Sequence, residues 1–346
     1  EPAGADAFDR YLQKGHFLPA EQNTQWWLDH ARAQLIQATE EMKELANSID
    51  STRSWKEQLA EIPDHHPTVD RYYQSFGEVW KTCRQQAIDA ELVTWPDFPI
   101  DFGPMPRSDR QAAKGRYYLY YRCPPPFGYH DSHRYVVPPC EPDMTPEEQE
   151  RVLRSTNDAQ ITLNHVIHHA GLGHHVQNYN AFRAESRVGQ MAGTDCASRV
   201  AMFCSGTLVE GWACYATELM EEIGALTDLQ RLSEAQTRLR MAARAVADTA
   251  IHSGEFSLEQ AARFYEDEAG MPASAALGEA VKNSMFPGAA VMYLSGTSGI
   301  HELRKQVEAR VGSAFDLKSF HDRFLSYGAI PVALIARSML GQSSPS

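Results

Sequence analysis

The chain has 346 residues, of which 43% are hydrophobic and 10% aromatic, enough for one large domain or two modest ones. Its net charge of −13 argues against a nucleic-acid partner, because phosphate binding requires a basic surface. Its apolar runs fall short of the ~18 residues that span a bilayer, and its six cysteines form no CxxC pair. We therefore expect a cytoplasmic protein with reduced thiols and no membrane partner.

The N-terminal part of the chain, residues 1–93, is predicted to be helical. Residues 23–49 start with Asn-Thr and carry apolar side chains at helical spacing, and residues 68–92 form a second candidate helix. Residues 94–143 are dense in proline and aromatic residues. We expect an irregular region with short strands there, including one at 115–123, rather than a disordered linker.

Residues 144–340 are predicted to be helical again, which gives a mainly α fold in a single domain. Thr145-Pro-Glu-Glu148 is a capping box with proline at the first helical position, and its helix should end near Gly171–Gly173. Further helices are expected over 207–223, 228–252, 257–269, 273–285, 299–311, 317–327 and 331–340.

The segment NHVIHHAGLGHHVQN, residues 164–178, holds five of the fourteen histidines. Zinc prefers nitrogen and sulfur ligands, and catalytic sites commonly combine three protein ligands with water. A lone histidine is usually an ordinary surface or core residue, but five so close together favour a metal site.

Two pairings of these histidines are open from spacing alone. His165 and His169 are four apart, the usual separation of two ligands on one helix. His168 and His174 are six apart and can converge only if the glycines at 171–173 break the helix. The spacing does not decide between the two pairs.

Glu210 is a candidate third ligand, at the predicted start of a later helix. A glutamate from a following helix is a common partner of such histidine pairs. The alternative is that Thr207 and Glu210 form a capping box, which would explain the glutamate without a metal.

Together these stretches resemble a bacterial family of unknown function, DUF885, a mainly helical, zincin-like group. Its members carry HExxPGHH followed by glutamine, and then an EGWA-type motif. Here the segments read HHAGLGHH at 168–175, with glutamine at 177, and EGWA at 210–213. Further similarity lies at 238–261, 286–296 and 320–331.

The resemblance implies a divalent metal held by three ligands: His168, His174 and Glu210. It also implies residues that orient the ligands from outside: His165, His175 and Gln177.

His169 stands where the family has the glutamate that takes a proton from metal-bound water. His169 could carry that proton, since its reference pKa near ~6.5 suits neutral pH, or it could bind the metal itself. Three histidines with one glutamate suit iron, manganese, nickel or copper as well as zinc.

We therefore expect a metal-dependent enzyme, with zinc or iron as the foremost metals. Redox or lyase chemistry on a small polar molecule that bears a carboxylate or amide is favoured. A zinc peptidase or amidohydrolase acting on a short peptide, with His169 as the base, stays open. So does an inactive binding protein, and the chain could be a monomer or a homodimer.

Arg240, Arg244, Asp248 and His252 are spaced by four, so they share one helix stripe. They could form a cationic wall that grips a substrate carboxylate, with His252 as a catalytic residue. The alternative is a solvated face on which Arg244 and Asp248 form a surface ion pair.

Tyr293 and His321 complete the candidates. Tyr293 follows a Pro-Gly break and could donate a hydrogen bond to a developing oxyanion, or it could be a core tyrosine. His321 could contact substrate, or it could cap or pack a helix.

Overall fold

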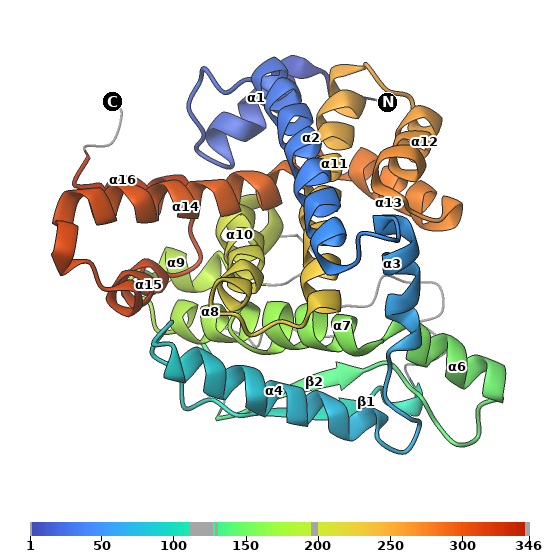
Figure 1. The fold of residues 1–346 in the computed structure, drawn as a ribbon. Helices are drawn as coiled ribbons and strands as arrows, with labels where there is room; N and C mark the ends of the chain where they lie inside the picture. Colours follow the sequence, from blue (N-terminus) through green and yellow to red (C-terminus); the bar gives the residue numbers. More distant parts are fainter. Residues whose placement is uncertain (1, 109, 111–126, 129–130, 195–199, 343–346) are drawn as a thin grey trace.

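The computed structural model describes residues 2–108, 110, 127–128, 131–194 and 200–342. Within these ranges the protein consists mainly of α-helices, with one pair of short strands at an edge of the molecule (Figure 1). The predicted mainly α fold is confirmed. In the part of the chain so described, no helix has both the length and the apolar composition to cross a bilayer.

The N-terminal elements are α1 (Ala5–Lys14), α2 (Thr24–Ile49), α3 (Trp55–Glu61), η1 (Ile62–Asp64) and α4 (Tyr72–Asp89). The strands β1 (Ile100–Pro104) and β2 (His133–Val137) pair in parallel, with Ile100 opposite His133. Short strands were therefore correctly expected within 94–143, whereas the candidate strand at 115–123 lies outside the described residues.

The middle of the chain forms α6 (Pro146–Ser155), α7 (Asp158–Gln160), the π-helix η2 (Ile161–Ala170), α8 (His174–Ala181), α9 (Arg187–Met191) and α10 (Val200–Glu222). The C-terminal elements are α11 (Asp228–Ser253), α12 (Leu258–Ala269), α13 (Ala273–Met285), α14 (Val291–Val311), η3 (Gly312–Ala314), α15 (Leu317–Ser326) and α16 (Val332–Leu340).

Helices start where the sequence offers a side-chain oxygen to the free N–H groups of the first turn. The Asn23 side chain caps α2. Thr227 and Ser257 form reciprocal capping boxes with Gln230 and Gln260 at the starts of α11 and α12. These predicted helix starts are confirmed.

Buried apolar side chains gather in two clusters. The first surrounds η2 and α10 and takes side chains from α4, β2, α8, α15 and α16. The second surrounds α11 and takes side chains from α1, α2, α12 and α13. In Figure 1, α2 lies along α11. Because apolar burial is the dominant favourable term in folding, both η2 and α10 are fixed by the first cluster.

The helices α10 and α14 touch backbone to backbone at Gly211 and Gly296. A Cβ on Gly296 would overlap the carbonyl oxygen of Thr207, and a Cβ on Gly211 would overlap the backbone of Gly296. This contact, which only glycine permits, fixes Glu210 relative to α14.

Three helix boundaries differ from the predictions. The helix that starts after Thr145 does not reach the histidines, because Thr156 leaves the helical conformation at φ −118° and ψ 51°. Asn157 then caps a new helix by accepting a hydrogen bond from the backbone N–H of Gln160.

The helix predicted over 207–223 starts earlier, at Val200, so Thr207 and Glu210 lie in its interior. The capping-box explanation of Glu210 is therefore excluded. The helix predicted over 299–311 likewise starts at Val291, which places Tyr293 in its first turn.

Candidate metal centre

The histidines at the N-terminal side of the site lie on a π-helix, η2. Such helices are rare and occur frequently at functional sites. The rings of His168 and His169 lie 4.7 Å apart. The ring of His174 lies 4.8 Å from that of His168 and 5.2 Å from that of His169. These distances join ring centroids, so the three rings lie close together.

The turn after η2 brings His174 back to the other two histidines. The N–H of Gly173 donates to the carbonyl of Ile167, and a Cβ on Gly173 would overlap the carbonyl oxygen of His168. A glycine is thus required where the sequence analysis placed a break. The His168–His174 pairing forms as a result.

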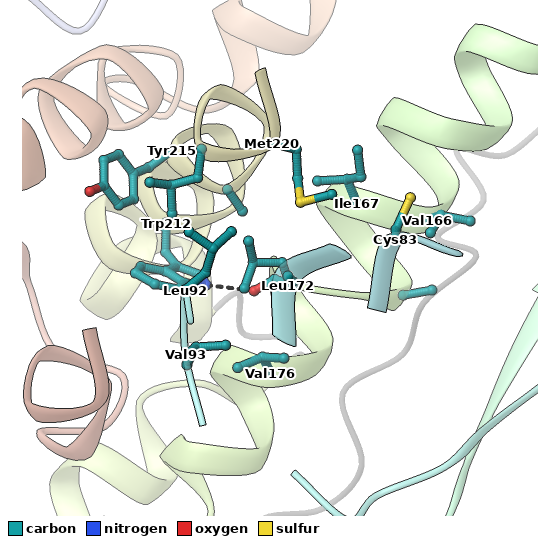
Figure 2. Close-up of a cluster of buried hydrophobic side chains, with 14 of the residues drawn as sticks. Cys83, Leu92, Val93, Val166, Ile167, Leu172, Val176, Trp212, Tyr215 and Met220 are labelled. Carbon is teal, nitrogen blue, oxygen red and sulfur yellow. Dashed lines mark hydrogen bonds between the residues drawn. The ribbon is translucent and has the colours of Figure 1, made fainter. Parts of the chain in front are cut away.

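Two indole groups hold the carbonyls of this turn. The Nε1–H of Trp212 donates to the Leu172 carbonyl at 2.8 Å, and that of Trp80 donates to the Ala170 carbonyl at 2.8 Å. Figure 2 shows Leu172 beside Trp212, within the first apolar cluster. The carbonyls of the turn between η2 and α8 are therefore held by indole groups that pack in or against the first apolar cluster.

The candidate ligand atoms of His168, His169 and His174 all lie within 4.8 Å of one another. Glu210, on α10, places its Oε2 3.4 Å from His168 Nε2 and 3.7 Å from His174 Nε2. Three imidazoles and one carboxylate from three elements are a donor set that fits a divalent first-row metal.

The carboxylate of Glu210 is held in its ionised form. Burial alone would raise its pKa. The hydrogen bond with His168 and the charges of His174, His168 and His169 outweigh burial and lower the pKa to about 2. Burial lowers the pKa of His174 to about 4. Neutral imidazole beside carboxylate is the protonation state that metal binding requires.

His169 is oriented by the backbone. Its Nδ1 lies 2.6 Å from the carbonyl oxygen of Asn164. A carbonyl only accepts, so Nδ1 carries the proton and Nε2 keeps its lone pair. Burial, reinforced by His168 and His174, lowers the pKa of His169 well below its usual value. His169 is therefore a neutral imidazole with one free nitrogen.

The residues predicted to support the ligands lie around the site with other partners. His165 pairs through Nδ1 with the hydroxyl of Tyr135 at 2.7 Å, so the alternative His165–His169 pairing is not formed. His175 donates from Nε2 to the Phe98 carbonyl at 2.7 Å. Gln177 is buried, and among the described residues its side-chain amide has no hydrogen-bond partner.

The arginines of the predicted cationic wall differ in their contacts. Arg244 forms two short contacts with Glu279, at 2.8 and 2.7 Å, and its guanidinium lies 5.6 Å from the centroid of the Tyr293 ring. Burial and the neighbouring Arg244 lower the pKa of Arg240, which has no ion pair within the described ranges. Among the described residues, only Arg244 of the two arginines therefore forms an ion pair.

Asp248 is not part of a surface ion pair, because its side chain is 0% exposed. Its carboxylate accepts from the backbone N–H groups of Gly288 at 3.1 Å and Ala290 at 2.8 Å, immediately before α14. The alternative of an Arg244–Asp248 surface ion pair is therefore excluded, because Asp248 accepts from backbone N–H groups and Arg244 pairs with Glu279.

His252 and His321 are buried and tie distant segments together. His252 accepts from the N–H of Ala3 at 3.2 Å and donates to the Asn283 carbonyl at 3.0 Å. His321 donates from Nδ1 to the Leu92 carbonyl at 2.6 Å, and its Nε2 lies 3.0 Å from the Tyr215 hydroxyl. The structure does not bring either residue into the histidine cluster.

A cavity of about 380 Å³ lies between α2, α10, α11 and α14. Tyr293 lines it, and so do five residues that the sequence analysis missed: Cys214, Glu218, Glu234, Arg238 and His301. Cys214 follows Glu210 by one turn of α10. Burial and the charges of Glu210, Glu234 and Glu218 raise the pKa of its thiol. The four-residue spacing of 210, 214 and 218 was the signal available in the sequence.

Two solved structures are similar in fold. One is a "putative lipoprotein of unknown function" from Shewanella oneidensis, with a TM-score of 0.82 and 22% identity, covering 98% of this chain and 60% of that one. The other is a "putative lipoprotein" from Colwellia psychrerythraea, with a TM-score of 0.79 and 20% identity, covering 98% of this chain and 56% of that one. The chain thus spans about three-fifths of these proteins, and the likeness is one of fold.

These two names contradict the predicted cytoplasmic location, which is withdrawn. That prediction rested on composition, the short apolar runs and the cysteine pattern. No curated protein matches the chain. The family described as bacterial protein of unknown function (DUF885) matches residues 2–339. The chain belongs to the DUF885 family, as its histidine and EGWA motifs indicated.

Proposed function

We propose that the protein is a metal-dependent enzyme that acts on a small polar molecule bound in the cavity that begins at Cys214, one helical turn from Glu210. One observation carries the proposal: three histidine ligand atoms within 4.8 Å of one another, with an ionised glutamate 3.4 Å from the nearest of them. A structural ion pair of Glu210 with one histidine would not require three imidazoles close together.

The residues that would hold one divalent ion are His168, His169, His174 and Glu210. Zinc or iron is the foremost choice, and manganese, nickel or copper also suits this set. Such an ion supplies Lewis acidity, and the redox-active metals supply electron transfer as well. The carbonyl of Asn164 orients His169, and the Tyr293 hydroxyl offers a hydrogen bond to substrate in the cavity.

The protonation of His169 favours non-peptidase chemistry. Its proton is on Nδ1 and is directed to Asn164, which leaves Nε2 as the nitrogen that can bind a metal. A histidine held in this way serves better as a fourth ligand than as the base of a zinc peptidase. Lyase or redox chemistry on a carboxylate- or amide-bearing molecule is the outcome this supports, on a zinc-peptidase-like helical scaffold.

Metal analysis of protein purified without added metal tests the proposal. We expect about one ion per chain in the wild type and a marked loss in His169→Ala. The exposed histidine His65 supplies a matched control, because His65→Ala should keep the full metal content. Absence of a tightly bound metal in the wild type would contradict the proposal.

His169→Glu separates the two enzyme classes. Suppose that this variant binds zinc and cleaves peptides that the wild type leaves intact. His169 then acts as a metal ligand in the wild type, at the position where a peptidase has its base. If wild-type protein already cleaves peptides, and His169→Gln abolishes cleavage but keeps the metal, the peptidase or amidohydrolase alternative is correct.

A further inference from the structure

The cavity lies along two parallel helices, and its lining begins at Cys214, one helical turn beyond Glu210. On α10, Cys214 and Glu218 follow Glu210 at four-residue intervals, and on α14, His301 follows Tyr293 by eight residues. The pairings of Thr297 with Gly211 and of His301 with Glu218 show that the helices run in the same direction. Eight residues of helix rise about 12 Å, so Glu218 and His301 form the far end of the cavity.

At this far end, His301 is held by a carboxylate. Glu218 Oε2 lies 2.5 Å from His301 Nε2, and the ring of Tyr215 packs edge-on against the imidazole at 4.9 Å. A carboxylate only accepts, so Nε2 carries a proton. In the neutral imidazole Nδ1 is then a hydrogen-bond acceptor. Both residues line the cavity.

Glu234 lines the same end from α11, and only 2% of its surface is exposed. Its Oε1 accepts from the Thr217 hydroxyl at 2.9 Å. Among the described residues, Oε2 has no hydrogen-bond donor. This oxygen is not fully buried, so within the cavity lining it can accept a hydrogen bond from a ligand that donates.

The cation nearest to Glu234 is already engaged. Arg238 lies 2.6 Å from Glu221 and 3.9 Å from Glu234. The other charged residues of the lining, Glu41 and Glu218, are acidic. The far end of the cavity therefore repels an anionic ligand. It offers several hydrogen-bond acceptors to a group with several donors.

From these contacts we infer that the cavity binds a small molecule carrying a primary ammonium group, which lies between Glu218, Glu234 and His301. An ammonium has three donors and no acceptor, which matches this set. The cavity volume is near the lower limit for small-molecule sites, which favours a short aliphatic amine. The reacting end of the same molecule points toward Tyr293 and Glu210.

The orientation of the reacting end rests on the proposed function, but the ammonium site does not. The class of substrate is thus an amino acid or amide whose amine and reacting group are separated by a short chain. The ammonium site and the metal-dependent function can be refuted independently, because amine binding is measured on chelator-treated protein and needs no metal.

The test is calorimetric titration of the metal-free protein with 5-aminopentanoate and, as its matched control, pentanoate. We expect saturable binding of the amine and binding at least tenfold weaker for pentanoate. Equal affinities, or no saturable binding of the amine, would overturn the inference. This comparison uses the wild-type protein, so it does not depend on the folding of any variant.

Glu218→Gln and Glu234→Gln should each weaken binding of 5-aminopentanoate at least tenfold. Glu222→Gln is the control on the same helix, because Glu222 pairs with Arg304 outside the cavity and should leave the affinity unchanged. Circular dichroism melting checks that each variant is folded. Unchanged affinity in folded Glu218→Gln or Glu234→Gln would place the ammonium elsewhere and refute the site.

Discussion

At Gly173 the backbone of the turn passes against the carbonyl of His168, so there is no space for a methyl group. We expect Gly173→Ala to lower the free energy of unfolding by about 3 kcal/mol or more, the range of large steric mutants. The same variant should lose metal, because His174 depends on this turn. Denaturant titration and metal analysis measure the two effects.

Gly278 provides the control for this substitution. It lies inside α13, and a Cβ there would meet no heavy atom within 4 Å. Gly278→Ala should be neutral or stabilise the protein by up to about 1 kcal/mol, because alanine is the better helix former. Similar destabilisation by both substitutions would refute the steric explanation.

Residue placement was predictable where a motif carried it. Spacing left two histidine pairings open, the resemblance to DUF885 selected His168 and His174, and the structure brings these two side chains together. The role of His169 was left open because it depends on the carbonyl of Asn164, which the π-helix places within reach. His252 and His321 were singled out by motif, and their hydrogen-bond partners, which include backbone carbonyls of distant segments, are not revealed by spacing.

Between α10 and α11 lies a buried ionisable group, Glu234. Burial, opposed by Arg238 and reinforced by Glu218, raises its pKa from 4.5 to about 7. The folded state thus holds this proton more tightly than the unfolded state. The stabilisation is present below pH 4.5 and is lost as the pH rises through about 7.

Glu234→Gln should therefore flatten the pH dependence of stability. Between pH values of about 5 and 8, the wild type should lose more unfolding free energy than the variant, by on the order of 3 kcal/mol at most. Urea titrations at both pH values measure the difference. Asp248, whose pKa burial also raises to about 7, is present in both proteins and cancels. Parallel pH profiles would contradict the buried-acid explanation.

At the scale of elements, helix existence was predicted better than helix ends. The α11 and α12 helices start and end at capping residues that the sequence displays. By contrast α10 extends upstream of Thr207, because its contacts with α14 and the first apolar cluster stabilise turns that carry no capping signal. Because α10 extends upstream of Thr207, Thr207 cannot be its N-cap, and the capping-box explanation of Glu210 fails.

Across the whole molecule, the four candidate ligands join three elements: η2, α8 and α10. A metal that binds only the folded state stabilises it by mass action, by about 2.7 kcal/mol at a hundredfold excess over Kd. We expect Tm to rise with metal concentration and to fall on chelation. His168→Ala should show neither response in differential scanning calorimetry. A Tm independent of metal in the wild type would argue against occupancy of the site.

The fold class and family of the whole chain were predictable, because helical periodicity and paired motifs can be recognised from residues that are close in the sequence. The cellular location was not. Acidic charge and scattered cysteines such as Cys83 and Cys140 are compatible with several compartments, so composition gave the wrong answer. The cavity was missed because its walls come from α2, α10, α11 and α14, which only tertiary packing brings together.

The two indoles that hold the turn at Ala170 and Leu172 give the protein an optical reporter. Trp80 and Trp212 each donate a hydrogen bond to a carbonyl between His169 and His174. Any shift of this turn on ligation changes the polarity that these two rings sense, and with it their emission wavelength. Occupancy of the centre should therefore be visible in the unlabelled protein, as a change of fluorescence that Trp80→Phe diminishes.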